Sequence, residues 1–378
     1  MSELDRAKGT LLGLAWGDVL GCPVEGWHQA DIAGIYEHYS DLPGKYPTAQ
    51  ILVRGSEKIK RLRPLGLHSD DTQQALALLN VCLSNAGWNR SSWASLLVDG
   101  MKLKAWRGYG RNFNSAIAKL RKGVSPQTSG SSSAGIGAAM RISVLGGLFR
   151  NRLEDLNAVS MESSLITHGD IRAGCLAYAV AWASAALCEG TAVSEIISGL
   201  PQEVAAVENE WLTNRSDWTI DRSAGHLISN ALKELLPRTE SGVELRNLIS
   251  TYAKPHLADG FTKAHPNQGF VLLGGIHGLK VALDCNDDPQ AALCEIIRQG
   301  YDTDTVAAIA GGILGARFGI SWIPLNRLID SNRLMMYAEA LATGHTCPES
   351  RAAFLKRETE LTEMERTFQR EMLSLLMP

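Results

Sequence analysis

The stretch YDTDTVAAIAGGILGARFG, Tyr301–Gly319, decides the fold of this chain. Its second part is rich in alanine and glycine, whose small side chains let helices approach one another closely. We therefore expect a tightly buried helix. Asp302, Asp304 and Thr305 crowd its N-terminus, where the helix dipole and free N–H groups favour negative charge. A helix cap needs one oxygen, so the surplus of oxygen-bearing side chains predicts a bound cation.

A second acidic cluster lies far upstream, at Ser69–Thr72, and the apolar residues of the following segment 73–83 repeat at helical spacing. If the two helix starts meet in the fold, their carboxylates would repel one another strongly unless a cation lay between them. All of these candidate ligands carry oxygen. The pattern therefore favours hard divalent cations such as Mg²⁺ or Mn²⁺ over Zn²⁺.

Composition excludes several classes of protein. The chain has 378 residues, a net charge of −3 and seven scattered cysteines. These values give no bulk signal for nucleic acid or a membrane surface, and the cysteines argue against a disulfide framework or a zinc site. The apolar segment Gly174–Cys188 is too short to span a bilayer. Asp18 and mixed charges interrupt the N-terminal apolar run, so we expect a cytoplasmic protein.

Helical periodicity dominates and alternating strand patterns are scarce, so we predict a mostly α-helical chain. The C-terminal segment 348–377 reads as a charged amphipathic helix that either caps the core or binds a partner. Asp18 is interpreted as a hydrogen-bonded structural acid. Glu25 follows a Gly/Pro-rich break, and a solvated loop position and a role in a site remain equally open.

The serine- and glycine-rich segment Ser125–Gly137 permits two interpretations. It has the composition of a disordered linker, and it also opens onto a helix in the way of loops that cradle phosphate with backbone N–H groups. Arg107 and Arg111 flank a glycine-punctuated turn and could hold phosphate. His168, a lone histidine after Thr167, is read by itself as structural.

Four blocks in this order resemble the ADP-ribosylglycohydrolase family, which includes dinitrogenase reductase activating glycohydrolase and the ADP-ribosyl-arginine and ADP-ribosyl-serine hydrolases. The blocks are Gly13–Glu25, Ser69–Thr72, Gly135–Arg141 with Thr167 and His168, and Asp302–Thr305 with the small-residue run behind it. The matches span residues 9–319. The sequence departs from the family pattern at several positions. Ile136 stands where asparagine is usual, Tyr301 where glycine is usual and Ser69 where threonine is usual, and Asp170–Ile171 replace the usual residues after the Thr-His pair.

The resemblance implies a single all-α domain over residues 1–378, an orthogonal helical bundle with two Mg²⁺ or Mn²⁺ ions in a cleft. The implied metal ligands are Ser69, Asp70, Asp71, Asp302, Asp304 and Thr305. The implied substrate contacts are Gly110, Gly135, Ile136, Gly137 and His168. Glu25 matches a mobile acidic position near the scissile bond, and the implied catalytic residues are Glu25, Asp70 and Asp304.

We therefore expect a metal-dependent hydrolase that removes ADP-ribose from a modified protein side chain, with ADP-ribosyl-arginine as the favoured linkage. The expected partners are an ADP-ribosylated protein, ADP-ribose as product and a cognate ADP-ribosylating toxin. Three alternatives stay open. The same centre could cleave serine-linked, nucleic-acid-linked or free ADP-ribose derivatives, the chain could be an inactive structural or binding homologue, or it could be an immunity protein that contacts the toxin.

Overall fold

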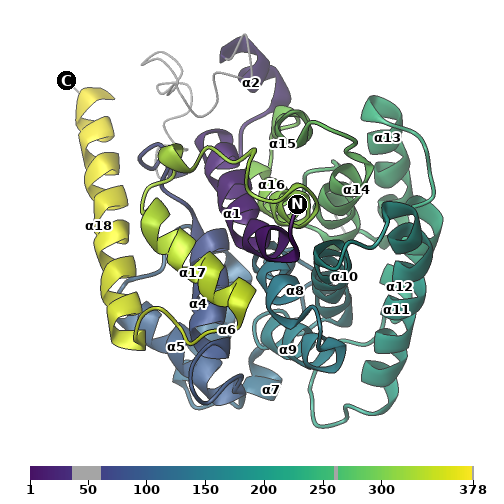
Figure 1. Ribbon diagram of the computed structural model, residues 1–378, viewed down its shortest axis with the longest axis horizontal. Coiled ribbons are helices and arrows are strands. Elements are labelled where there is room, and N and C mark those ends of the chain that lie inside the picture. Colours follow the sequence, from purple (N-terminus) through teal and green to yellow (C-terminus); the bar gives the residue numbers. More distant parts are fainter. Residues whose placement is uncertain (36–60, 259–262, 377–378) are drawn as a thin grey trace.

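The computed structural model of the chain describes residues 1–35, 61–258 and 263–376. These residues form 17 α-helices and no strand, and 69% of the structure is helical (Figure 1). The predicted all-α fold class is confirmed. The helices of the first half are α1 (Glu3–Gly21), α2 (Gln29–Ile35), α4 (Asp70–Cys82), α5 (Arg90–Lys102), α6 (Arg111–Arg121), α7 (Pro126–Ser129), α8 (Ser143–Phe149), α9 (Leu153–Leu165) and α10 (Ile171–Cys188). Those of the second half are α11 (Val193–Thr213), α12 (Leu227–Leu235), α13 (Gly242–Ala253), α14 (Ile276–Asp284), α15 (Pro289–Arg298), α16 (Thr303–Phe318), α17 (Ser331–Thr343) and α18 (Arg351–Leu376).

Helices α1 and α16 form the central pair. Glycine recurs at every fourth position of α1, at Gly9, Gly13, Gly17 and Gly21, and so lies on one face of the helix. A Cβ atom at Gly13 would overlap the backbone oxygen of Gly311, and one at Gly9 would overlap that of Gly315. The two backbones therefore touch directly. Because the order of contacts is antiparallel, the acidic start of α16 lies beside the C-terminal end of α1.

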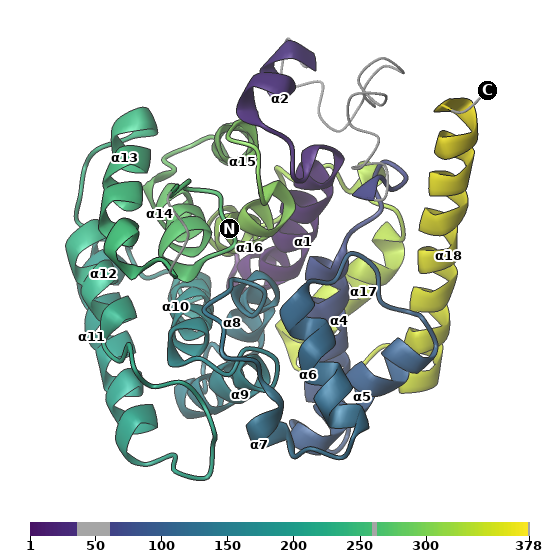
Figure 2. The same cartoon turned by 180° about the vertical axis from the view of Figure 1, so that it is seen from behind.

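The remaining helices pack around this pair in an arrangement seen from both sides in Figures 1 and 2. Helix α10 contacts α8, α9, α11 and α16. Its length and composition would allow it to cross a membrane, but 83% of it is buried inside the structure, as expected for a core helix. Helices α11, α12 and α13 lie on one flank, and α18 lies on the other (Figures 1 and 2).

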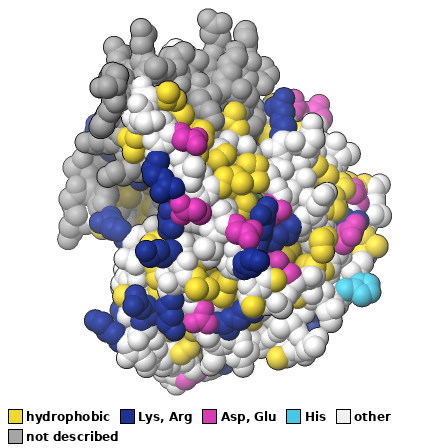
Figure 3. All heavy atoms as spheres, turned by 90° about the vertical axis from the view of Figure 1, so that its left-hand side faces the viewer, with side chains coloured by type: hydrophobic (Ala, Val, Ile, Leu, Met, Phe, Trp, Pro, Cys, Tyr) yellow, Lys and Arg dark blue, Asp and Glu magenta, His cyan; other side chains and the backbone are white. Residues whose placement is uncertain are grey.

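Helix α18 caps the core with one face. Glu358, Leu361, Thr362 and Glu365 are buried at helical spacing along it. The interpretation of the C-terminal segment as a cap on the core therefore holds for this inner face. Residue 377, the last residue of the predicted helix, lies outside the described residues. On the side of the molecule that carries α18, basic and acidic side chains are interspersed on the surface (Figure 3).

The contact between α1 and α16 predicts a strong effect of a single methyl group. Gly13→Ala should lower the free energy of unfolding by more than about 2 kcal/mol, because the added Cβ meets backbone that cannot rotate away. Gly34→Ala is the matched control, since no atom of the described residues lies within 4 Å of a Cβ there. Thermal and denaturant unfolding measure both variants. Equal stability of Gly13→Ala and wild type would contradict the direct backbone contact.

Candidate metal centre and substrate cavity

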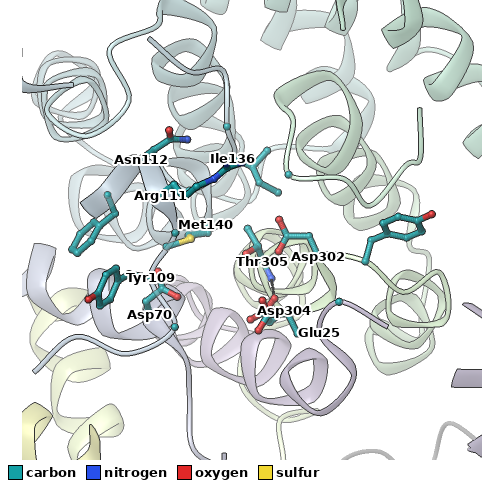
Figure 4. A pocket seen from close by; sticks show the side chains of 18 of the residues that line it. Glu25, Asp70, Tyr109, Arg111, Asn112, Ile136, Met140, Asp302, Asp304 and Thr305 are labelled. Carbon is teal, nitrogen blue, oxygen red and sulfur yellow. Dashed lines mark hydrogen bonds between the residues drawn. The ribbon is translucent and has the colours of Figure 1, made fainter. Parts of the chain in front are cut away.

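The two predicted acidic segments meet at one cavity of about 870 Å³. Asp70 lies at the start of α4, and Asp302, Asp304 and Thr305 lie at the start of α16 (Figure 4). The Thr303 hydroxyl donates to the carbonyl of Gly21 at 2.8 Å, which fastens the start of α16 to the end of α1. The convergence expected from sequence is therefore present.

Asp18 fixes the start of α4 against α1. Its Oδ2 accepts from the Thr72 hydroxyl at 2.6 Å and from the Thr72 backbone N–H at 3.1 Å, and both of its oxygens accept from the Ser69 N–H at 3.0 Å. The interpretation of Asp18 as a structural acid is confirmed. Asp18 is the buried connection that brings Ser69–Thr72 to α16.

Ser69 and Asp71 lie behind the cavity wall and do not line it. The Ser69 hydroxyl donates to Asp71 Oδ2 at 2.8 Å, and Ser69 caps α4 by accepting from the Asp71 N–H. The other carboxylate oxygen, Asp71 Oδ1, is buried without a hydrogen-bond partner. An unpaired carboxylate oxygen in the interior is costly, and a cation is the partner that would satisfy it.

The converging carboxylates raise one another's pKa. Burial raises the pKa of Asp70 to about 8, and removal from water together with the charge of Glu25 raises that of Asp302 to about 6. The pKa values of Asp71 and Asp304 are also raised, first by burial and then by neighbouring carboxylates. Oxygen donors that repel one another in this way fit a hard divalent cation, whose charge would reverse the repulsion.

A further grouping consists of Asp18, Cys22 and Asp304, whose ligand atoms lie within 4.8 Å of one another. Two of its three side chains, Asp18 and Cys22, already have hydrogen-bond partners. Asp18 accepts the bonds described above, and the Cys22 sulfur donates to Asp18 at 3.0 Å and accepts from Arg63 at 2.9 Å. We therefore place the candidate cation site at the predicted carboxylates and read Cys22 as part of the packing beneath it.

The five predicted substrate contacts, Gly110, Gly135, Ile136, Gly137 and His168, all line the same cavity. The serine- and glycine-rich segment is well ordered there, because Ser131 donates to the carbonyl of Thr167 and Gly169 donates to that of Ser131. The linker interpretation of this segment is wrong. Ile136 is only 2% exposed, and a Cβ at Gly274 would lie 3.0 Å from its Cδ1, so its side chain packs into the core.

Arg141 ties the substrate side of the cavity to the metal side. It donates to the carbonyl of Gly137 at 3.2 Å, to the Thr167 hydroxyl at 2.8 Å and to Gln74 Oε1 at 2.5 Å. Gln74 in turn donates to Asp70 Oδ2 at 2.8 Å. The arginine at the end of the third motif therefore orients a predicted metal ligand, a role that the sequence did not indicate.

His168 enters the cavity as a neutral imidazole. Its Nδ1 lies 2.9 Å from the Thr167 hydroxyl, and burial lowers its pKa to about 3. A Cβ added at Gly137 would lie 3.0 Å from His168 Nε2, so the glycine keeps the backbone close to the ring. The structural and substrate-contact interpretations of His168 are compatible, because one nitrogen is held and the ring faces the cavity.

Glu25 lies on the cavity wall, which favours the interpretation of a role in the site over that of a solvated loop acid. It follows the short 3₁₀ turn Cys22–Val24, and its Oε1 pairs with Arg61 Nη1 at 2.5 Å. Its side chain is 16% exposed and that of Arg61 is 55% exposed. A carboxylate at this place can orient a substrate while its partner arginine faces solvent.

The two candidate phosphate ligands separate in the structure. Arg111 lines the cavity next to Asn112 (Figure 4). Arg107 is buried and donates to Glu358 Oε2 at 2.8 Å, so its assignment to phosphate is wrong. Sequence reasoning missed several other lining residues, namely Arg61, Arg63, Gln74, Tyr109, Asn112, Phe113, Met140, Asn267, Gln268 and Gly269. Apart from Met140, which lies in the block Gly135–Arg141, no short motif marks these positions.

The backbone conformation of Tyr301 explains why glycine is usual at this position. Its φ is +63°, in the left-handed region that costs a side-chain-bearing residue about 1 kcal/mol or more and favours glycine. The ring stacks on His265 with centroids 3.9 Å apart and lies 6.2 Å from His28. Stacking therefore offsets the strain and places an aromatic wall beside Asp302 in the cavity.

Comparison with known proteins agrees with this geometry. Human ADP-ribosylhydrolase ARH3 is 26% identical over 350 residues, covering 85% of this chain and 88% of that protein. The uncharacterized protein YegU of Escherichia coli is 27% identical over 369 residues, covering 90% and 97%. A solved structure titled ADP-ribosylglycohydrolase-related protein complex shares the fold, with a TM-score of 0.60, 22% identity and coverage of 90% and 98%. Residues 1–350 match the model of the ADP-ribosylglycohydrolase family, and the chain therefore belongs to that family.

Proposed function

We propose that the protein uses two Mg²⁺ or Mn²⁺ ions to hydrolyse ADP-ribosyl-arginine on a modified protein, which reverses mono-ADP-ribosylation. The observation that carries the proposal is the convergence of Asp70, Asp302 and Asp304 at one cavity, with Asp71 behind its wall and Asp71 Oδ1 unpaired among the described residues. Membership of the family supports hydrolysis of an ADP-ribose linkage in general. The metal ions and the arginine linkage go beyond family membership and belong to the proposal.

The proposed role of each residue follows from its position in the site. Ser69, Asp70, Asp71, Asp302, Asp304 and Thr305 would hold the ions. When bound, the ions supply positive charge that binds ribose hydroxyls and makes water a better nucleophile. Gly135–Gly137 and His168 orient the ADP-ribose from the opposite wall. In the reaction the bond from the anomeric carbon to the guanidine nitrogen breaks, through an oxocarbenium-like transition state, and the oxygen of water bonds to that carbon.

The arginine linkage suits the charges on the cavity wall. A substituted guanidinium is a cation before cleavage, and Glu25 with the aspartates attracts it. Because it is protonated before cleavage, the leaving group departs as a neutral guanidine, which then takes up the proton released by the attacking water. A serine linkage leaves as an alkoxide and needs a stronger acid. His168 is a poor acid at neutral pH because its pKa is lowered to about 3.

The metal site predicts a characteristic dependence on pH. The pKa values of Asp70 and Asp302 are raised from 3.8 to about 8 and about 6, so the metal-free folded chain binds protons that the unfolded chain has lost. Metal-free stability should therefore fall as pH rises from about 4 to about 8. Cation binding needs ionised carboxylates, so the increase in melting temperature caused by Mn²⁺ should grow over the same range. An equal increase at pH 5 and pH 8 would contradict the assignment.

Asp304→Asn tests one ligand directly. The amide keeps the shape of the side chain but removes the charge that a cation needs, so turnover should fall by orders of magnitude. The metal-free variant should melt at a higher temperature than metal-free wild type, because repulsion with Asp71 and Glu25 is relieved. Asp155→Asn, at an exposed surface ion pair, is the control and should change neither quantity. Wild-type turnover in Asp304→Asn would show that the residue is not a ligand.

The linkage is tested by release of ADP-ribose from arginine-, serine- and nucleic-acid-linked substrates at equal enzyme and Mg²⁺. We expect the arginine linkage to be cleaved fastest and EDTA to abolish the reaction. Glu25→Gln should reduce cleavage of the arginine linkage more strongly than that of the serine linkage, and Mn²⁺ should still stabilise the variant. Faster cleavage of the serine linkage would overturn the choice of substrate and leave the metal site intact, whereas full activity in EDTA would overturn the metal site.

A further inference from the structure

Helix α18 begins at Arg351, directly after the region that matches the family, so the match says nothing of its role. Its inner face reaches the loop that leads into the acidic start of α4. Gln369 donates to the carbonyl of Leu62 at 2.9 Å, and Glu365 accepts from Arg63 Nε at 2.8 Å. The helix is therefore attached to the loop that delivers Ser69–Thr72.

The second attachment lies about two helical turns earlier. Glu358 is fully buried and accepts from Arg107 at 2.8 Å, from Arg333 at 2.6 Å and from Gln73 at 2.8 Å. Arg107 also donates from Nε to the carbonyl of His68 at 2.9 Å. Glu358 thus fixes the end of the loop and the first turn of α4, while Glu365 fixes the beginning of the loop.

Arg63 links Glu365 to the cation site. It is 4% exposed and lines the cavity, and its Nη1 lies 2.9 Å from the Cys22 sulfur and 3.9 Å from Asp304 Oδ2. The hydrogen bond to Glu365 is much shorter than the approach to Asp304. The guanidinium therefore lies near enough to balance part of the negative charge of the site but is held short of a direct hydrogen bond to this predicted ligand.

We propose that α18 tunes the cation site, with Glu365 as a positioning residue that holds Arg63 back from Asp304. This inference rests on the proposed metal site. Without the carboxylate of Glu365, Arg63 would turn its charge onto Asp304 and compete with the incoming cation. Without Arg63, the same aspartates would present more net negative charge and bind a cation more tightly. The two losses should therefore act in opposite directions.

The experiment measures the Mn²⁺ half-point, which is the concentration that fills half of the sites, from the dependence of melting temperature on Mn²⁺ concentration for the full chain at constant pH. Glu365→Gln should raise this concentration roughly tenfold, a change that one charge-assisted contact commonly supplies. Arg63→Met should lower it, and the double variant should behave like Arg63→Met because the competing cation is gone. Glu363→Gln is the matched control on the same helix, since among the described residues Glu363 pairs with exposed Arg366 and Arg370.

The outcomes separate the two proposals. If the wild-type chain responds to Mn²⁺ and Glu365→Gln responds identically, the role of α18 is overturned and the metal site stands. If the wild-type chain shows no response, the metal site falls and the tuning falls with it. If Glu365→Gln does not fold, Arg63→Met decides, and an unchanged or raised half-point in that variant overturns the proposal. If Glu365 had only a structural role, Glu365→Gln would lower stability at every Mn²⁺ concentration without moving the half-point.

Discussion

The direct backbone contact between α1 and α16 is the constraint on which the rest of the structure depends. Glycines at every fourth position of α1 let the two helices touch, and the antiparallel order places the start of α16 beside the end of α1. Thr303 then bonds to Gly21, and Asp18 on the same helix holds Ser69 and Thr72. One helix therefore carries the anchors of both acidic segments, and the distance between those segments is set by packing in the core.

The same arrangement concentrates charge where a protein would otherwise avoid it. Asp70, Asp71 and Asp304 are at most 8% exposed, and the pKa of each is raised by burial. In the metal-free chain this site opposes folding, and the surrounding structure must hold it together. The opposing support comes from buried arginines: Arg141 orients Asp70 through Gln74, and Arg63 and Arg107 are paired with carboxylates of α18. Destabilisation at a site and compensation around it are usual where binding needs converging like charges.

The sequence predicted the parts of the site whose signal is local. Carboxylates in excess of what a helix cap needs indicate a ligand, so Asp70, Asp302, Asp304 and Thr305 could be proposed from sequence. That they line one cavity is seen only in the structure. Pairings between distant positions have no such signal. Arg63 and Glu365 are 302 residues apart, and nothing distinguishes the buried Arg107 from the cavity-lining Arg111 except what packs on each of them. The positive φ of Tyr301 could not be predicted from sequence either, because it depends on the chain path from Gly300 into α16.

The N-cap residues show whether the oxygen-bearing side chains at each helix start are used as caps. Ser69, Asn89 and Asp170 each accept a backbone N–H of the helix they begin, as capping residues do. Asp302 occupies the same position at the start of α16 and makes no such bond. Asp330 at the start of α17 also makes no cap bond, and its carboxylate pairs instead with Arg357. The Asp302 carboxylate is likewise not used as a cap and lies near Thr305 and Asp304, two other proposed ligands. Together with Asp71 Oδ1, which has no hydrogen-bond partner among the described residues, this supports the proposed cation site over two ordinary capped helices.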